Sequence, residues 1–327
     1  MNCFRKNKLL KVLAHIVLIF GLSAIKFAYA YTGVTILMSS QTPAYTEFVD
    51  NFRIDLANSQ NNGLRVNVVV MQELDKFEVA ENSELVIALG AKALEAASML
   101  KHTTSVLGVY TPLLIFNQIL ANSKRELSNF STIVLDQPYW RQLALIKTVL
   151  PETKKVGVLL GPASSQYLDV LKDEADQLGL TLMDENVSND ADLIPKLKKL
   201  LDSSEAMLAI PDRSIYNRET AESILLTSYR HQKPMFGYSQ SYVKAGALAS
   251  VYSSTKQIAR QAVEIAIKSQ PASNQLPSPQ IPKYFSVAIN QQVAHSLNIA
   301  IADEDAIYKK MLMLVSRETL ENEEKKH

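Results

Sequence analysis

The segment AMLAIPDRSIYN, residues 206–217, places a carboxylate, a guanidinium and a hydroxyl directly after a short apolar run. A carboxylate accepts hydrogen bonds from amines and hydroxyls, and a guanidinium binds carboxylates. Asp212 is therefore the leading candidate for contact with a ligand amine or hydroxyl. Arg213 is either its structural partner or a contact for a ligand carboxylate, and both readings stay open. Ser214 or Asn217 is expected to cap the helix that follows.

Other residues that follow short apolar runs are also candidate ligand contacts. Hydroxyls and amides pair with polar solutes, a glycine lets the backbone approach a ligand, and a tyrosine ring stacks on a flat solute. Each has a structural alternative in loop polarity, helix capping, a tight turn or core packing. The further candidates are Ser39, Ser40, Gln41, Gly90, Ala91, Thr111, Asp136, Gln137, Ser164, Ser165, Tyr238 and Gln240.

Enzyme chemistry finds no support in the residue pattern. The chain contains no G-x-S-x-G elbow, no phosphate-binding P-loop and no H-E-x-x-H zinc motif. Beyond residue 30 the histidines are scattered and lack metal-ligand spacing, and the carboxylates alternate with lysine and arginine as on solvated helices. We therefore expect no catalytic residues, no metal site and no cofactor.

The N-terminus is typical of a secretory signal peptide. Residues 5–11 carry four positive charges, residues 12–25 (VLAHIVLIFGLSAI) are apolar, and AYA at 28–30 provides a small-x-small cleavage site. This predicts that residues 1–30 are removed and that the protein is exported to the periplasm. The alternative is an uncleaved membrane anchor, which Lys26 after the apolar stretch leaves open.

Charge and cysteine content narrow the class of the mature protein. Removal of residues 1–30 takes away five positive charges and no negative ones, so the formal net charge falls from +1 to −4. A basic surface for nucleic acid is not expected. The one cysteine, Cys3, lies in the predicted leader, so disulfides and thiolate metal sites are excluded from the mature chain. The 47% hydrophobic content can supply ordinary apolar cores instead.

Short β-branched runs alternate with segments of helical periodicity along most of the chain. This alternation predicts parallel sheets with helices on both faces, and two successive series predict two such domains. In open parallel sheets, ligands bind beyond the carboxyl ends of the strands. The candidate residues named above follow the expected strands, so they are expected to lie at those ends. The expected strands span 33–38, 65–70, 84–90, 105–110 and 130–136 in the first series, and 155–161, 180–187, 206–212 and 234–239 in the second. The expected helices lie near 45–58, 91–101, 165–178, 192–202 and 217–231.

The C-terminal third resembles a known family. The segment YVKAGALASVYSSTKQIARQAVEIAIKSQ, followed by a Pro/Ser-rich link, FSVAIN and VAHSLNIAI, is similar to the closing part of ABC-transporter substrate-binding proteins from a family linked to aromatic amino acids. LPETKKVGVLLGP and AMLAIPD stand at matching places upstream. The resemblance covers nearly all of the mature chain.

The resemblance implies a type I periplasmic-binding fold, in which two Rossmann-like α/β lobes are joined by a three-strand hinge and close on a solute. The hinge strands would lie near 130–138, 246–254 and 284–290, and helix 256–268 would pack on the first lobe. Asp136 and Gln137 would fall on the hinge, where they either meet a ligand or hold the crossing strands together. The implied boundaries are 31–134 plus 252–282 for one lobe, 135–251 plus 283–303 for the other, and 304–327 for a helical tail.

The chain departs from the family pattern in two segments, YTPLLIFNQIL from residue 110 and IVLDQP from residue 133. Both segments are expected to face the cleft, so the identity of the ligand stays open. The resulting prediction is a monomeric, exported protein that captures a small molecule, with an aromatic amino acid as the leading candidate, for the permease of an ABC importer. The alternatives are a ligand sensor that feeds a membrane receptor or kinase, an enzyme, and a scaffold with a degenerate cleft.

Overall fold

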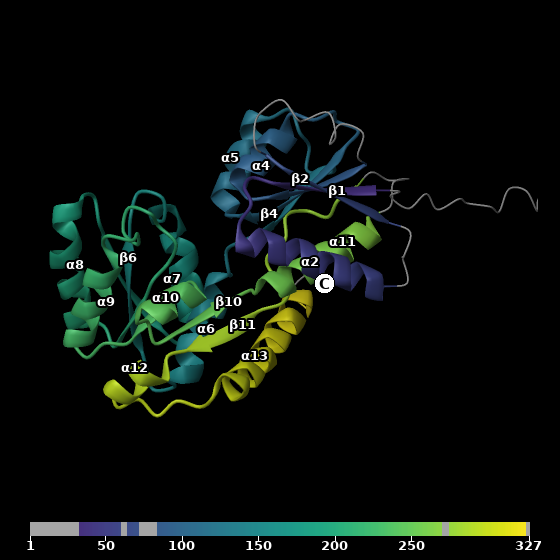
Figure 1. Ribbon diagram of the computed structural model, residues 1–327. Coiled ribbons are helices and arrows are strands. Elements are labelled where there is room, and N and C mark those ends of the chain that lie inside the picture. The colour runs from purple at the N-terminus through teal and green to yellow at the C-terminus, as the bar shows by residue number, and fades with distance from the viewer. Residues whose placement is uncertain (1–32, 60–63, 72–83, 270–274, 325–327) are drawn as a thin grey trace, which may run out of the picture.

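The computed structural model describes residues 33–59, 64–71, 84–269 and 275–324. Two β-sheets, each covered by helices, are joined by three chain segments (Figure 1). The predicted signal peptide lies outside the described residues. Within the described ranges, every helix is too short or too polar to span a bilayer.

Sheet A contains five parallel strands in the order β2-β1-β3-β4-β5. Its central strands are buried on both faces, which explains why they read as unbroken apolar runs. Parallel pairing brings all the carboxyl ends to one edge of the sheet. The strands are β1 (Gly33–Met38), β2 (Arg65–Val70), β3 (Leu85–Leu89), β4 (Ser105–Thr111) and β5 (Phe130–Val134).

Among the described residues, four helices cover sheet A, and one of them comes from far along the chain. Helices α2 (Pro43–Asn58) and α11 (Thr255–Lys268) pack on one face, while α4 (Ala91–Ser98) and α5 (Leu113–Asn122) cover the other. The small alanines of α11 allow this helix to pack closely on α2, where the ring of Phe48 belongs to the same core. The expected packing of helix 256–268 on this sheet is therefore observed, whereas α5 was not among the expected helices.

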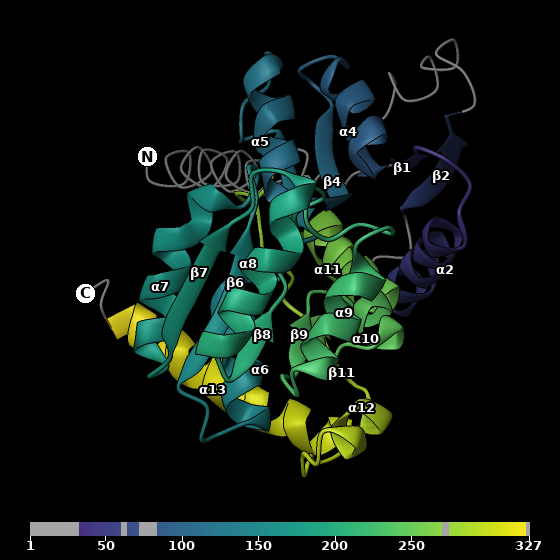
Figure 2. The ribbon, with the colours of Figure 1, turned by 90° about the vertical axis from the view of Figure 1, so that its left-hand side faces the viewer.

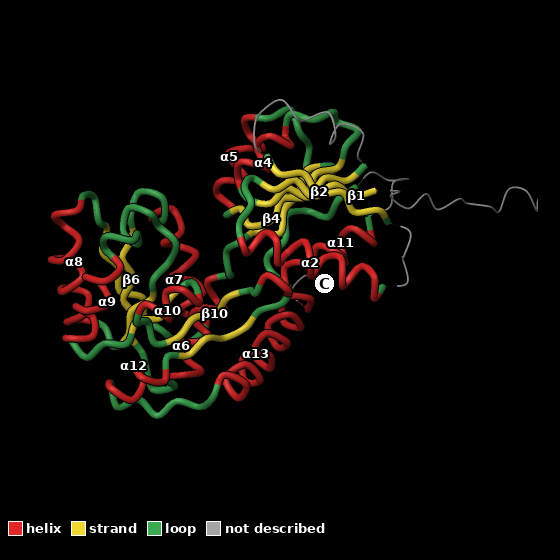
Figure 3. The backbone as a smooth tube through the Cα atoms, in the orientation of Figure 1, coloured by secondary structure: helices red, strands yellow, loops and turns green. Residues whose placement is uncertain are grey.

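Sheet B contains six strands in the order β11-β10-β9-β8-β6-β7. Figure 3 draws the strands in yellow and labels β6 and β10 of this sheet. All neighbouring strands are parallel except β10 and β11, which are antiparallel. The reason is topological, because β10 leaves this sheet toward the hinge and β11 returns from it. The strands are β6 (Lys155–Leu160), β7 (Thr181–Asn186), β8 (Ala206–Leu208), β9 (Met235–Gly237), β10 (Ala249–Tyr252) and β11 (Ser286–Ile289).

Helices also cover both faces of sheet B. One core lies under α6, α7 and α13, and a second core lies under α8, α9 and α10. Helix α13 runs beside α6 in Figure 2, and its buried Ile307 and Met311 belong to the first of these cores. The C-terminal tail is thus a packed helix over its first turns. The helices are α6 (Tyr139–Val149), α7 (Leu168–Gln177), α8 (Asp190–Ser203), α9 (Ala221–Arg230), α10 (Gln240–Ala245), α12 (Gln291–Ser296) and α13 (Glu304–Glu324).

The three hinge segments, residues 135–138, 253–254 and 281–285, are tied together by one hydroxyl. Gln137 Nε2 donates to Ser253 Oγ at 2.8 Å, and Ser253 Oγ donates to the carbonyl of Tyr284 at 2.6 Å. Arg141 at the start of α6 donates to Gln137 Oε1 at 2.7 Å and to the carbonyl of Pro282 at 3.0 Å. Of the two readings that the sequence allowed for Gln137, the geometry favours the one in which it holds the crossing strands together.

The third hinge segment is also fastened along α11. Gln257 Nε2 donates to the carbonyl of Phe285 at 2.8 Å, and Gln261 Oε1 accepts the amide of Lys283 at 2.7 Å. Gln257 completes a capping box with Ser254 at the start of the same helix. The segment is therefore held to the helix of sheet A until it enters β11.

Candidate ligand-binding site

Asp212 lies in the loop after β8, and its carboxylate is fully engaged by protein donors. Oδ2 accepts the amide of Ser164 at 3.0 Å and its hydroxyl at 2.8 Å, while Oδ1 accepts the amide of Ser214 at 3.0 Å and its hydroxyl at 2.7 Å. Burial alone would raise the pKa of Asp212, but these hydrogen bonds hold it below its ordinary value. The side chain is 5% exposed.

Asp212 has a structural role, because its hydrogen bonds join the loop after β6 to the loop after β8. A Cβ at Gly161 would lie 2.6 Å from Asp212 Oδ2, so the two loops are in direct contact. Arg213 is exposed and forms no salt bridge with Asp212, so a structural pairing is not observed in the described structure. Asn217, one of the two residues expected to cap the next helix, lies just before α9. Its Oδ1 accepts the amides of Glu219 at 2.9 Å and Thr220 at 3.1 Å.

The carboxyl edge of sheet A, called rim A here (residues 39–45, 90–91 and 110–113), surrounds Gly90. Gly90 has φ +87°, and a Cβ there would lie 3.0 Å from Ser39 Oγ and would overlap Tyr45 Oη. Both hydroxyls therefore sit over the first turn of α4. Among the predicted contacts on rim A, Ser40 and Gln41 are exposed, while Ser39 and Ala91 are half-buried.

Tyr110 is a rim A residue that sequence reasoning missed. It has φ +58°, at a point where the β4–β5 register shifts. Its ring lies 5.6 Å from that of Tyr45 and 5.8 Å from that of Phe48, and burial raises the pKa of its phenol to about 12. A bulky residue with positive φ is uncommon and concentrates at functional sites. Thr111, the predicted neighbour, is fully buried.

The corresponding edge of sheet B, rim B (residues 161–167, 209–217 and 238–240), adjoins a cluster of three tyrosines. The ring of Tyr238 lies 5.3 Å from that of Tyr242 and 6.1 Å from that of Tyr216. Tyr238 is half-buried, and burial raises the pKa of all three phenols. Tyr238 is thus the most accessible of the three tyrosines. The predicted contact Gln240 is exposed, and its amide donates to Tyr252 Oη at 3.2 Å.

The remaining predicted residues also lie at rim B or at the hinge. Ser165 is exposed at the start of the short helical turn Ser165–Tyr167, whereas Ser164 is buried against Asp212. Asp136 is half-buried, and its Oδ2 accepts the amide of Leu113 at 2.7 Å. The structure therefore places all fourteen predicted residues at strand ends or on the hinge, but several of them contact protein groups only.

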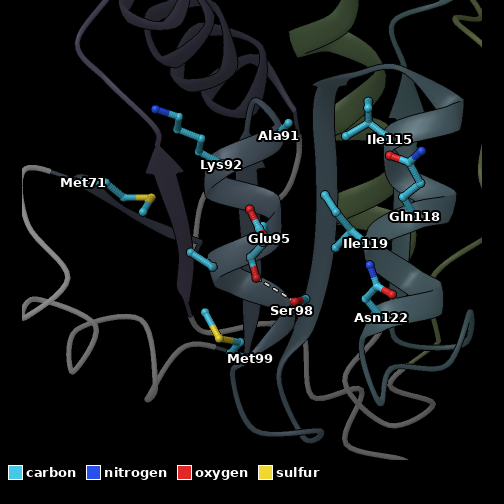
Figure 4. Close-up of a pocket in the computed structure, with 11 residues that line it drawn as sticks. Met71, Ala91, Lys92, Glu95, Ser98, Met99, Ile115, Gln118, Ile119 and Asn122 are labelled. Atoms are coloured by element: carbon cyan, nitrogen blue, oxygen red, sulfur yellow. Dashed lines mark hydrogen bonds between the residues drawn. The ribbon is translucent and has the colours of Figure 1, made fainter. Parts of the chain in front are cut away.

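A separate groove of about 600 Å³ lies between α4 and α5 (Figure 4). It is lined by Met71, Lys92, Glu95 and Ile119, among others, and of the predicted contacts only Ala91 borders it. The groove runs along the helices and not across the strand ends, so we do not assign the ligand to it. Within the described ranges, no three histidine, cysteine or acidic residues are grouped as metal ligands would be.

Two α/β lobes joined by three hinge segments, with polar and aromatic side chains on both rims, define a two-lobe solute-binding protein of the periplasmic-binding type. The family model for ABC transporter substrate binding proteins matches residues 44–310. The chain belongs to this family, as the sequence resemblance predicted. No curated protein sequence matches it.

Solved structures share the fold at low sequence identity. A substrate binding protein with adhesive properties from Clostridium difficile, in its ligand-free, open form, has 15% identity and a TM-score of 0.68, over 83% of this chain and 96% of that one. An ABC domain from Streptococcus pneumonia in complex with L-Trp has 16% identity and a TM-score of 0.54, over 86% and 98%. The arabinose binding protein AraP of Geobacillus stearothermophilus has 13% identity and a TM-score of 0.52, over 81% and 99%.

Proposed function

We propose that this protein binds a small, flat solute between rim A and rim B and closes around it. The observation that carries the proposal is that both rims present tyrosine rings: Tyr45 and Tyr110 lie on rim A, and Tyr238 lies on rim B. Tyrosine rings give a large apolar contact face and a polar tip. Contacts made by both lobes at once would favour the closed state, which is how a ligand shifts a hinge equilibrium.

An aromatic amino acid or a related compound fits these rims best. Support comes from the tyrosine rings and from the L-Trp complex of the Streptococcus protein that shares the fold. A fold neighbour that binds arabinose keeps a sugar as the competing ligand class. Stacking on tyrosine suits both classes, so the charge of the ligand becomes the informative property.

The proposal extends to place and partner. The protein is exported to the periplasm, acts as a monomer without catalytic turnover, and delivers its solute to the permease of an ABC importer. Membership of the substrate-binding family supports the permease as partner. A pull-down from membranes that recovers a receptor or kinase and no permease would replace the importer with a sensing system.

Mass spectrometry of small molecules released by denaturing the purified protein tests the binding function. We expect one compound in near-equal amount to the protein, and its addition to the stripped protein should lower the radius of gyration in solution scattering. A saturating ligand that leaves the scattering curve unchanged would disprove closure. A protein that releases nothing and responds to no solute in a broad thermal-shift screen would disprove the binding function itself.

A further inference from the structure

We propose that the ligand carries a cationic amine, which binds the carboxylate of Asp136 beside the rings of Tyr139 and Tyr167. This inference rests on the proposed solute-binding function and specifies the charge of its substrate. The sequence favoured Asp212 as the contact for a ligand amine, and we now assign that contact to Asp136.

The position of Asp136 suits a ligand contact because both lobes meet there. It lies in the first hinge segment, directly after β5, and its Oδ2 accepts the amide of Leu113 at the start of α5. Leu113 follows the carboxyl end of β4, so the carboxylate sits beside rim A. Tyr167, which interacts electrostatically with Asp136, follows β6 on rim B.

The two carboxylates differ in how much of their binding capacity is used. Asp212 accepts four hydrogen bonds from Ser164 and Ser214. Asp136 receives the amide of Leu113 and interacts with its own amide, and no lysine, arginine or histidine of the described chain forms a salt bridge with it. Burial raises the pKa of Asp136, whereas the pKa of Asp212 is lowered. A desolvated carboxylate with spare acceptor capacity gains most from an incoming cation.

The neighbouring rings add to the attraction for a cation. The rings of Tyr139 and Tyr167 lie 5.7 Å apart with their planes inclined by 55°, and both side chains are half-buried. Asp136 interacts electrostatically with both phenols. Tyrosine faces attract ammonium groups through their quadrupoles, and aromatic pairs of this kind recognise amines elsewhere.

The other charges nearby do not supply the missing cation. Arg141 is directed toward Gln137 Oε1 and the carbonyl of Pro282, and its guanidinium lies 4.6 Å from the ring of Phe285. Arg141 thus donates to oxygens of the hinge and forms no salt bridge with Asp136 in the described structure.

A matched series of indoles tests the inference by calorimetric titration of the stripped protein: L-Trp, tryptamine and indole-3-propionate. We expect the two amines to bind and indole-3-propionate to bind at least about tenfold more weakly, the effect of losing one charged hydrogen bond. Asp136→Asn should weaken the amines by about tenfold and should not weaken indole-3-propionate, because the variant removes a negative charge beside an anionic ligand. Asp50→Asn, an exposed carboxylate on α2, is the matched control and should change nothing.

A second pair of variants separates the rings from the carboxylate. Tyr167→Phe should retain amine binding, and Tyr167→Leu should weaken it several-fold. Equal binding of all three indoles, or full affinity in Asp136→Asn, would overturn the inference while the solute-binding function stands.

Where none of the indoles binds, the compound released on denaturation decides. An amine whose affinity falls in Asp136→Asn supports the inference, and a neutral sugar or an anion overturns it. Absence of any released or bound solute would overturn the proposed function and this inference together.

Discussion

The two rims are built in different ways. Rim B is fastened by a buried carboxylate, because Asp212 joins the loops after β6 and β8 through four hydrogen bonds. Rim A is shaped by packing, with Tyr45 and Ser39 over Gly90 and with Tyr110 against the ring of Tyr45. A polar fastening fixes one geometry and fails when one partner is removed, whereas packed rings can shift to suit a ligand. We therefore expect rim B to be the rigid half of the proposed site and rim A the adaptable half.

The largest expected effect comes from removing the carboxylate of rim B. Asp212→Ala leaves the amides and hydroxyls of Ser164 and Ser214 without their acceptor, so we expect the free energy of unfolding to fall by about 3 kcal/mol. Urea denaturation of the ligand-free protein measures it, and Arg213→Ala is the adjacent exposed control. Unchanged stability with abolished binding would return Asp212 to the ligand-contact role that the sequence suggested.

A smaller effect is expected where the two loops of rim B touch. Gly161→Ala places a Cβ 2.6 Å from Asp212 Oδ2, which must move together with its partners. We expect a loss of about 2 kcal/mol, in the range of overpacked sites. Ser165→Ala in the same loop should change the stability by less than about 0.5 kcal/mol, as at other exposed positions. Equal stability of both variants would show that rim B is not rigid.

The hinge connects the two rims and should respond more weakly. Ser253→Ala removes the hydroxyl between Gln137 and Tyr284, and the expected loss is about 1 kcal/mol. Because this hydroxyl links the hinge segments, solution scattering should also show a broader range of ligand-free conformations. Ser296→Ala, which removes a hydroxyl from the exposed helix α12, serves as the control. Identical scattering of the two variants would contradict a role in restraining the hinge.

The smallest effect is in the pH dependence of stability, and it should have opposite signs for the two carboxylates. The lowered pKa of Asp212 contributes stability above its ordinary value of 3.8, and this contribution is lost as the pH falls through the lowered pKa. The raised pKa of Asp136 does the reverse, because stability falls as the pH rises from 3.8 toward the raised pKa. The free energy of unfolding is measured between about pH 3 and pH 6 for the unmutated protein, Asp212→Asn and Asp136→Asn. The difference between the unmutated protein and each variant gives the slope for that carboxylate. Slopes of the same sign would refute the contrast.

The fold was predictable because its main signals are local. Apolar runs such as residues 85–89 identify buried strands, and their alternation with helical patterns predicts the two sheets. The joining of the two lobes by a hinge was implied by the family resemblance, and the structure confirms both features. Helix α5 was missed because LLIFNQIL is apolar around most of its circumference and follows Pro112, so it lacks a clear helical face. The antiparallel direction of β11 was not predicted either, since it depends on which side of the hinge the chain returns from.

The site was predictable only in outline. Strand ends located the candidate residues, but their partners are distant in sequence, as with Asp212 and Ser164, 48 residues apart. Nothing local distinguishes a carboxylate that holds two loops together from one that is free for a ligand. The tyrosines of both rims were missed, apart from Tyr238, because ring contacts such as that of Tyr45 with Tyr110 depend on the tertiary fold.

The position of α11 has a consequence for the order in which the chain can fold. Its residues 255–268 complete the core of sheet A against α2, although the last strand of that sheet ends at Val134. One face of the first lobe is therefore only partly covered, by α2, until most of the chain has been synthesised. Contacts of such long sequence separation slow folding. A chain that completes its first core late is expected to fold slowly, which would suit the proposed export across a membrane before folding.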